Sequence, residues 1–426
     1  MKKKSEFQKQ IDDRELSSQI QMQIEAESRN LFKNEVRRRH AMSAGGKKIA
    51  MLVVVLLVLF TASIMLVPTG NTSLWAWRQE VIGRVSDLFS LTLASRWRIC
   101  AYAAMVFVGM AMATCGAVFQ GVFQNPMASP TTLGVQAGGT LGGLVYILFF
   151  LDGATLTFYT DHLVDFGDGN AIFVASGNEI LNYYESLSQY QEFAVQIWEV
   201  LGCFFGVALI VGISMMSGKG KISTVALMLA GSIFSTVVNQ LGQTVQYIIL
   251  YNKPEEMEDV RYYLISELLG SSSGIDSNIL PVDEFLWMAI PISICLIVLF
   301  SMTGKLNILM FGEDEARAMG VPVQTYRIIF IVFCTLASAV VLSFCGQVSM
   351  LGFLIPHLAR FLVGPDFKYL VPASALMGGI TTLLVWDFCC VCNEIESFNM
   401  YTGVVCCILS VIFILFYRRN RHADWS

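Results

Sequence analysis

The sequence predicts an all-α polytopic membrane protein with about ten transmembrane helices. Hydrophobic residues occupy 55% of the 426 positions and charged residues only 14%, whereas soluble domains carry roughly 25% charged residues. Apolar runs of about twenty residues, the length that crosses a bilayer core of about 30 Å, recur along the chain. These observations exclude an ordinary soluble enzyme. The 29 Phe, 7 Trp and 14 Tyr exclude a disordered chain.

A polar basic tail, residues 1–47, precedes the first apolar run. The run Arg37–Arg39 and the pair Lys47–Lys48 stand just before that run, and so long a polar region does not fit a secretory signal peptide. We expect a cytoplasmic tail that is either solvated or in part a helix on the membrane surface. Residues 48–417 then form the transmembrane domain, and residues 418–426 form a short cytoplasmic end.

Ten apolar runs are expected to enter the membrane. One of them, near 350–364, is short and contains Pro356 and His357, so we expect it to form a broken or short helix. The other expected helices lie near residues 48–67, 98–121, 132–151, 196–216, 223–250, 285–303, 326–345, 370–392 and 399–417.

Loop charge predicts the orientation of these helices. In a ten-helix count, the basic loops and both termini fall on one side, which is therefore the cytoplasm. The opposite side carries an acidic insertion, residues 152–195, without any Lys or Arg, and a second acid-rich loop at 251–284. We therefore predict a multi-pass protein of the cell membrane with cytoplasmic N- and C-termini.

A polar stripe runs along the expected helix 223–250. Five hydroxyl and amide side chains fall within an arc of about 80° when each residue turns the helix by about 100°. Such residues either hydrogen-bond neighbouring helices or line a water-filled pathway. Because the stripe extends over most of the span, we favour a translocation pathway. Its members are Ser232, Thr236, Asn239, Gln243 and Gln246.

The segment 120–130 interrupts the apolar pattern between two expected helices. It contains two prolines and three amides, and irregular backbone at membrane depth must be covered by protein or line a cavity. We therefore add Gln120 and Asn125 to the candidate pathway. The glycines that follow repeat every four residues, which predicts a face where another helix packs closely. They are Gly134, Gly138 and Gly142.

The expected cytoplasmic loop 304–325 contains a short charged helix. Glu313 and Arg317 are four residues apart in the order that favours an ion pair. Gly320 is expected to end the helix, because glycine is the usual residue after a helix C-terminus. This pattern alone fits any solvated helix.

The sequence predicts no catalytic residue, no cofactor and no metal site. No segment resembles a nucleotide-binding P-loop, a zinc-binding HExxH motif or a Ser/His/Asp hydrolase site, and the four histidines are scattered. The eleven cysteines lie in or beside apolar runs without metal-ligand spacing. They are either small packing side chains or, from Cys389 to Cys407, a cluster of thiols.

Three separated blocks are similar to the permease family of ABC importers for iron siderophores, haem and vitamin B12, the type II importers. The first block, residues 115–139, reads CGAVFQGVFQNPMASPTTLGVQAGG and resembles the family's Asn-Pro-Leu-Ala region. The second, residues 312–321, reads GEDEARAMGV and resembles its ATPase-docking element. The third, residues 352–379, reads GFLIPHLARFLVGPDFKYLVPASALMGG and resembles its Pro-His-x-x-Arg block.

The resemblance implies a membrane subunit that hydrolyses no ATP itself. It implies a homodimer, or a pair with a related permease, in which the substrate crosses between the two subunits. Two separate ABC ATPase subunits and an extracytoplasmic substrate-binding protein complete the expected complex, and no nucleic acid is involved. The residues matching the ATPase-docking element are Gly312, Glu313, Ala316, Arg317 and Gly320.

The chain also departs from the family pattern. The family's Arg-x-Pro-Arg before the second span is reduced to Ser95–Arg98, and residues 394–403 replace a proline-containing Glu-x-Pro-x-Gly. Arg96 and Arg98 stand at the expected outer end of the second span. We expect them either to pair with acidic residues of the binding protein or to anchor the helix at the lipid headgroups.

The expected cargo is a ferric siderophore or a similar bulky chelate, with haem and cobalamin as alternatives. The metal arrives bound to its chelator, so the permease needs no metal-ligating residues of its own. A secondary transporter is a further alternative, but it needs ion-coupling charges near the midplane, and Asp387 lies near an outer end. A membrane enzyme or electron carrier needs paired histidines or a metal cluster, and His357 stands alone among the spans.

Overall fold

The computed structural model describes residues 45–66, 93–150, 163–165, 171–173, 189–217, 224–251, 282–348, 350–392 and 398–419. The chain divides after Met51 into two units. The described residues of the first unit, 45–51, are the first turns of the helix Gly45–Leu66. The arrangement that follows is that of the second unit, which begins at Leu52.

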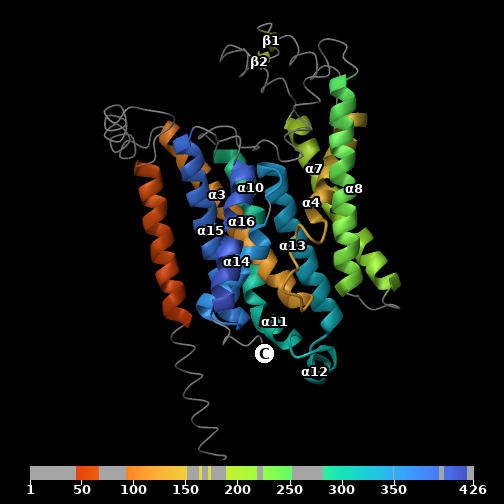
Figure 1. Ribbon diagram of the computed structural model, residues 1–426, viewed down its shortest axis with the longest axis vertical. Coiled ribbons are helices and arrows are strands. Elements are labelled where there is room, and N and C mark those ends of the chain that lie inside the picture. Colours follow the sequence, from red (N-terminus) through yellow and green to blue (C-terminus); the bar gives the residue numbers. More distant parts are fainter. Residues whose placement is uncertain are drawn as a thin grey trace, which may run out of the picture. The chain divides into compact units, whose positions relative to one another are not determined.

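The described residues are almost entirely helical, and each of the ten expected membrane segments corresponds to a helix (Figure 1). The first half of the chain contains Gly45–Leu66, α3 (Leu93–Val122), α4 (Val135–Phe149), α7 (Gln189–Ser217) and α8 (Thr224–Tyr251). The second half contains α10 (Val282–Ser301), α11 (Thr303–Leu309), α12 (Glu313–Ala318), α13 (Val323–Cys345), α14 (Leu351–Val363), α15 (Phe367–Cys392) and α16 (Phe398–Arg419).

The lengths of these helices agree with a membrane-spanning fold. Within the described ranges, 7 helices are long and apolar enough to cross a membrane. The helix α14 has 13 residues and therefore extends about 20 Å, less than a bilayer core. This confirms the short helix predicted from Pro356 and His357.

The acidic insertion is described only in part. The strands β1 (Leu163–Asp165) and β2 (Ala171–Phe173) form a two-stranded antiparallel sheet in which Leu163 lies opposite Phe173. The helix α7 begins at Gln189, so its first turns belong to the segment that the sequence assigned to the insertion. The remainder of the insertion and the N-terminal tail lie outside the described residues.

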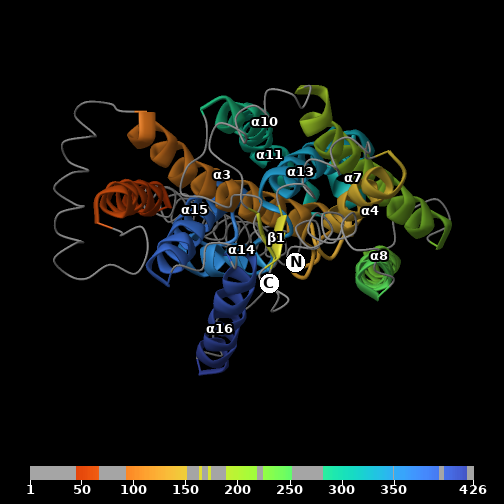
Figure 2. The ribbon, with the colours of Figure 1, turned by 90° about the horizontal axis from the view of Figure 1, so that it is seen from above.

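The helix α3 lies at the centre of the second unit, packed against α10, α13, α14 and α15. In Figure 2 it runs between α15 and α13. Small residues allow this close packing, because a Cβ on Gly109 would collide with the Gly378 carbonyl and a Cβ on Gly116 with the Gly352 carbonyl. Close backbone approach of this kind is a main source of attraction between helices in lipid.

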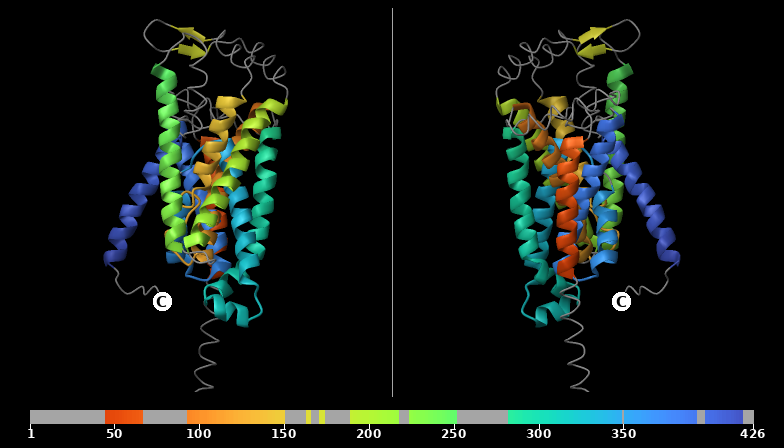
Figure 3. Two further views of the ribbon diagram at one scale, coloured as in Figure 1. Left: turned by 90° about the vertical axis from the view of Figure 1, so that its right-hand side faces the viewer. Right: turned by 90° about the vertical axis from the view of Figure 1, so that its left-hand side faces the viewer.

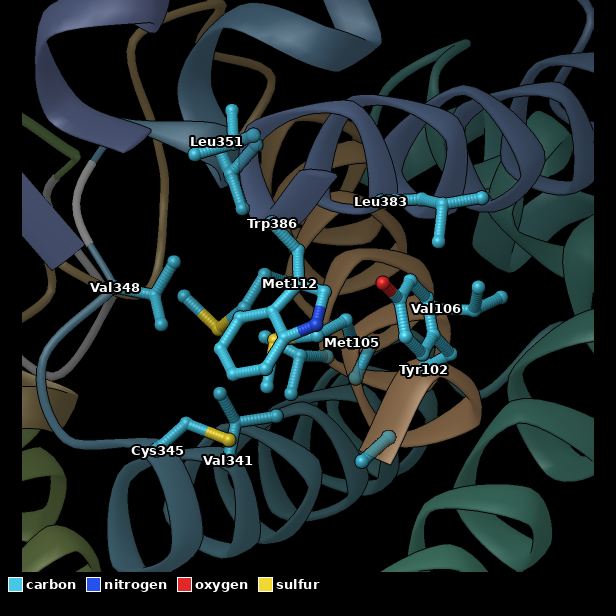
Figure 4. Close-up of a cluster of buried hydrophobic side chains, with 14 of the residues drawn as sticks. Tyr102, Met105, Val106, Met112, Val341, Cys345, Val348, Leu351, Leu383 and Trp386 are labelled. Atoms are coloured by element: carbon cyan, nitrogen blue, oxygen red, sulfur yellow. The ribbon is translucent and has the colours of Figure 1, made fainter. Parts of the chain in front are cut away.

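Large side chains fill the space around these glycine contacts. The indole of Trp386, on α15, is fully buried and lies among Met105 and Met112 of α3 and Val341 of α13 (Figure 4). Tyr102 lies one turn before Met105 and is also buried. Because lipid tails are themselves apolar, dense packing rather than exclusion of water holds such a core together.

A second packing group consists of α4, α7 and α8. A Cβ on Gly138 would collide with the Gly202 carbonyl, and a Cβ on Gly142 would collide with the Trp198 carbonyl. Gly134 precedes α4 with a φ of 67° and also faces α7, where a Cβ would press on Ile210. These contacts confirm the small-residue face predicted from the four-residue repeat.

The cysteines pack as small side chains. All eleven lie within the described ranges, and only Cys392 and Cys407 are exposed. Cys389, Cys390 and Cys406 belong to the hydrophobic core around α3. This placement favours the packing interpretation over a thiol cluster.

Candidate translocation pathway and coupling element

The helix α8 packs on α4 and α7 through one face and leaves the other face open (Figure 3). Leu227 and Val238 are buried on the packed face, where a Cβ on Gly231 would collide with the Thr132 carbonyl. Apolar residues every four positions occupy the open face, from Val225, 78% exposed, to Leu241, 49% exposed. In a membrane such a face meets lipid or another helix.

The predicted polar stripe lies along the border between these two faces. Ser232, Thr236 and Gln243 are exposed and Asn239 is half-buried, whereas the side chain of Gln246 lies outside the described residues. The two hydroxyls hydrogen-bond carbonyls of their own helix, Ser232 to Leu229 at 3.0 Å and Thr236 to Ser232 at 2.8 Å. These hydroxyls therefore do not use their hydrogen bonds to hold another helix.

Asn239 connects the stripe to a buried amide cluster that sequence reasoning missed. The Gln347 amide donates to Thr140 of α4 at 2.7 Å and to the Asn239 side chain at 3.4 Å. The Gln136 amide, 2% exposed, donates to the Val348 carbonyl at 3.0 Å. A stripe residue thus contacts a side chain of the connection between α13 and α14.

The backbone around Gln347 is irregular. Gly346 has a φ of 67° and Met350 a φ of 65°, and the short α14 begins only after this bend. A nonhelical connection at membrane depth is tolerated where protein covers it or where it lines a cavity. The sequence carried one signal for this connection, because Gly346 and Gln347 interrupt two apolar runs. A single amide beside a helix end is, however, usually interpreted as a capping residue.

Gln120 faces the protein interior in this conformation. It is 3% exposed, its amide donates to the Phe353 carbonyl at 3.2 Å, and its carbonyl accepts from Arg360 at 3.4 Å. The structure therefore joins Gln120 to α14 and separates it from the stripe on α8. Its assignment to the pathway stays a prediction.

Asn125 lies nearer to the stripe helix. Its amide contacts the sulfur of Met228 on α8 at 2.7 Å, and its side-chain oxygen accepts from the Met127 amide at 2.9 Å. The next residue, Pro126, accepts a hydrogen bond through its carbonyl from the His357 imidazole, with 2.8 Å between Nε2 and O. The irregular segment after α3 is thus fixed to both α8 and α14.

The charged helix of the 304–325 loop forms as α12, between two residues with positive φ. Gly312 precedes it with a φ of 113° and Gly320 follows it with a φ of 75°. The Gly320 amide bonds the Arg317 carbonyl at 2.9 Å and the Val321 amide bonds the Ala316 carbonyl at 3.0 Å. This pair of bonds is a Schellman motif, which confirms that the helix ends at Gly320.

The stronger partner of Glu313 is Arg327, which the sequence analysis did not identify. Arg327 lies on the first turns of α13 and approaches the carboxylate at 2.8 Å, with its side chain 12% exposed. The predicted partner Arg317 lies at 3.7 Å and is 55% exposed. The Glu313–Arg327 pair therefore fixes α12 to α13, and Arg317 adds a weak solvated contact.

The segments that flank α12 expose apolar side chains. Phe311 is 69% exposed, Met310 45% and Met319 51%. Asp314 and Glu315 are also exposed, on α12 itself. Figure 3 shows α12 beyond the ends of α10 and α13.

The helix α11 is anchored at the start of α15. The Asn307 amide donates to the Asp366 carboxylate at 2.7 Å, and the Phe367 backbone amide donates to the Asn307 side chain at 2.9 Å. Asp366 also accepts from the Lys368 amide at 3.0 Å, which makes it an N-cap of α15. Both α11 and α12 are therefore attached to membrane helices.

The predicted docking arginines are placed only in part. Arg98 is half-buried on α3, and the side chain of Arg96 lies outside the described residues.

Asp387 and Glu199 are acidic residues within the described spans. Asp387 accepts a hydrogen bond from Ser63 at 2.6 Å and so joins the first span to α15. The sequence analysis did not identify the other acid, Glu199 on α7, which is 6% exposed. It lies about 8 Å from Ala194, the first residue of the candidate span Ala194–Ser217.

Together these features define the class of protein: a polytopic helical permease with a polar stripe on one span and a clamped charged helix beyond the spans. The FecCD transport family model matches residues 53–419. The chain therefore belongs to the FecCD transport family, the permeases of type II ABC importers for iron siderophores, haem and vitamin B12.

Relatives with different stated cargoes are similar to this chain. The cobalamin import permease of Halobacterium salinarum is 25% identical over 314 residues, 74% of this chain and 70% of the relative. The Fe(3+)-citrate import permease of Bacillus subtilis is 26% identical over 317 residues, 74% and 78% of the two chains. The molybdate import permease of Haemophilus influenzae is 27% identical over 281 residues, 65% and 67%.

A solved structure supports the same fold. It is an inward-facing ABC transporter of the metal-chelate type, with a TM-score of 0.62 and 22% identity, and the match covers 87% of this chain and 99% of the other. At this identity the likeness establishes the fold alone. Permeases of this family are the membrane components of importers that work with separate ATPase and binding-protein partners.

Proposed function

We propose that this chain is the membrane subunit of an ATP-driven importer that moves a ferric siderophore inward across the cytoplasmic membrane. Two copies, or one copy and a related permease, pair around the pathway. Two separate ATPase subunits bind on the cytoplasmic side and a substrate-binding protein docks outside. The chain itself hydrolyses no ATP, and both of its termini lie in the cytoplasm.

The observation that carries this proposal is the coupling element, which we define as residues 303–320. It follows α10, whose 20 residues extend about 30 Å, and so lies at the end of a complete membrane crossing. Phe311 exposes 69% of its surface there, and an exposed aromatic side chain beside acidic residues suits a protein partner. The Glu313–Arg327 clamp lets a force on this element reach α13.

The polar stripe supports a pathway beside α8. Its hydroxyl and amide groups carry no net charge, so they can hydrogen-bond a passing chelate without holding it as a fixed charge would. We include Asn125 and Gln120 in this pathway. Because Gln120 is buried in this conformation, it would have to become accessible in another conformation of the transport cycle. In Figure 2, α8 and α16 lie along the same side of the chain, and we assign this side to the second subunit.

Arg96 and Arg98 are proposed to dock the binding protein. Both follow the start of α3, and charged groups at the rim of an interface mainly raise the rate of association. Exchanging both for Glu should slow the binding of the substrate-binding protein, and the effect should shrink as salt is added. An unchanged association rate would leave these arginines as headgroup anchors.

The choice of cargo rests on chemistry that several chelates share. A ferric siderophore offers hydroxamate, catecholate or carboxylate oxygens to the hydroxyls and amides of the stripe. Relatives include importers of iron citrate and of cobalamin. Cobalamin is therefore a competing cargo, and haem is a further one. A secondary transporter is disfavoured because Glu199 lies near one end of its span rather than at the midplane.

Uptake by the complete complex tests this proposal. The permease, its ATPase and its binding protein are reconstituted in liposomes, and labelled ferric siderophore, haem and cobalamin are supplied in parallel with ATP inside. We expect accumulation of the ferric siderophore, and no accumulation with an ATPase variant that cannot hydrolyse ATP. Accumulation of haem or cobalamin alone would replace the proposed cargo.

A further inference from the structure

The central helix α3 ends at an unusual residue. Gln124 has a φ of 48° and is one of two non-glycine residues with positive φ in the described part of the chain. The backbone N–H of Gln124 donates to the backbone carbonyl of Gly121 at 3.2 Å. The backbone N–H of Asn125 donates to the backbone carbonyl of Gln120 at 3.1 Å. This is the Schellman geometry in which glycine is the usual residue, because a Cβ disfavours the left-handed conformation.

The side chain of Gln124 makes a contact that glycine could not make. Its Nε2 donates to the Leu309 carbonyl at 2.7 Å. Leu309 is the last residue of α11, and carbonyls at a helix C-terminus lack donors within their own helix. Gln124 therefore caps the coupling element from the end of the central helix.

The residues after Gln124 contact the stripe helix. Asn125 reaches the Met228 sulfur at 2.7 Å, and the Ser235 hydroxyl donates to the Thr131 carbonyl at 3.4 Å. The Thr132 carbonyl lies where a Cβ of Gly231 would be. One short stretch of chain thus contacts α11 at its start and α8 at three points along its length.

A small apolar cavity borders this stretch. Apolar side chains of α3, α7, α8 and α13 line it, among them Leu227 of α8, together with Phe123 and Leu133 of the connection between α3 and α4.

We propose that residues 124–132 relay motion between the coupling element and the stripe helix, with Gln124 as the positioning residue at the coupling end. The relay rests on the proposed function, because it links an ATPase contact to a pathway. Energetic coupling between distant sites is carried by contiguous contacts of this kind. The strained backbone at Gln124 accompanies a side chain that hydrogen-bonds α11.

The test separates the hydrogen bond from the backbone strain. Gln124→Gly removes the amide and relieves the positive φ, so the folded permease should be at least as resistant to heat as the parent. The Leu309 carbonyl nevertheless loses its shorter hydrogen bond, at 2.7 Å, and keeps the longer one from the Gly312 backbone amide, at 3.3 Å. Met350→Gly is the matched control, because Met350 has a similar φ of 65°, and relieving it should leave the coupling element unchanged.

Two measurements read out the result. In the full-length permease in nanodiscs, hydrogen exchange at residues 303–318 should become faster by about fivefold in Gln124→Gly, the scale of one lost hydrogen bond. In the complete complex, ferric siderophore imported per ATP hydrolysed should fall by a similar factor while ATP hydrolysis continues. Met350→Gly should change neither quantity.

Either measurement can overturn the relay. Unchanged exchange in Gln124→Gly shows that the side chain does not hold α11, whatever the cargo. Faster exchange with parental import per ATP shows that the contact is structural alone. If the parent complex itself imports nothing with ATP, the proposed function fails, and the exchange measurement on the permease still decides whether Gln124 holds α11.

Discussion

The clamp between α12 and α13 allows a quantitative prediction. Replacing Arg327 by Met keeps most of the side-chain volume but removes the donor that lies 2.8 Å from the Glu313 carboxylate. A hydrogen bond to a charged group contributes about 1.5–3 kcal/mol. Because Glu313 is 30% exposed and water can partly replace the donor, we expect about 1.5 kcal/mol, or about tenfold in the population of docked α12.

The assay is the number of cargo molecules imported per ATP hydrolysed by the reconstituted complex. Arg327→Met should lower this ratio by up to about tenfold, since an undocked α12 cannot pass a force to α13. Arg317→Met is the matched control for the docking of α12, measured by hydrogen exchange at residues 313–318 and not by import, because Arg317 itself matches the ATPase-docking element. Its guanidinium lies 3.7 Å from Glu313 and is 55% exposed, so its loss should cost less than about 0.5 kcal/mol.

A charge exchange strengthens the test. Glu313→Arg alone places two cations together and should uncouple the complex. Adding Arg327→Glu restores an opposite-charge pair and should recover part of the import, and the non-additivity measures the interaction itself. If Arg327→Met imports at the parental ratio, the clamp does not transmit force and the reasoning is wrong.

Three further predictions concern the surface, the stripe and the core. Phe311→Ala should leave the thermal stability of the permease unchanged but weaken its affinity for the ATPase by about tenfold or more, as loss of an aromatic anchor does; equal affinity in a binding titration would remove Phe311 from the interface. Replacing Asn239 and Gln243 by Leu should abolish import with normal expression, whereas a destabilised protein with residual import would indicate a packing role, worth about 0.6 kcal/mol per interhelical hydrogen bond. Gly116→Ala should lower the unfolding temperature, since its Cβ collides with the Gly352 carbonyl and overpacking costs about 1–3 kcal/mol; Gly212→Ala, with open space around it, should not.

Sequence reasoning identified the features that depend on local pattern. Apolar length located a described helix at each of the ten expected segments, 7 of which are long and apolar enough to cross a membrane, because a bilayer sets the length of a spanning helix. The four-residue glycine repeat located the contact between α4 and α7, because that spacing places small residues on one helix face. The end of α12 at Gly320 followed from a rule on backbone conformation.

The missed features depend on contacts between distant segments. Arg327 lies 14 residues from Glu313, and only the turn between α12 and α13 brings the pair together. Gln347 meets Thr140 across 207 positions of sequence, which no periodicity reveals. Gln124 looked like one of three amides in a loop, and its role depends on a positive φ and on the position of α11.

The dependence of inward transport on ATP tests the central claim most directly. Labelled ferric siderophore and the binding protein are placed outside liposomes that hold the permease and its ATPase, with and without ATP inside and with an ionophore that removes ion gradients. A permease of an ABC importer requires ATP and is unaffected by the ionophore. Uptake that continues without ATP and stops with the ionophore would identify a gradient-driven transporter and contradict the claim.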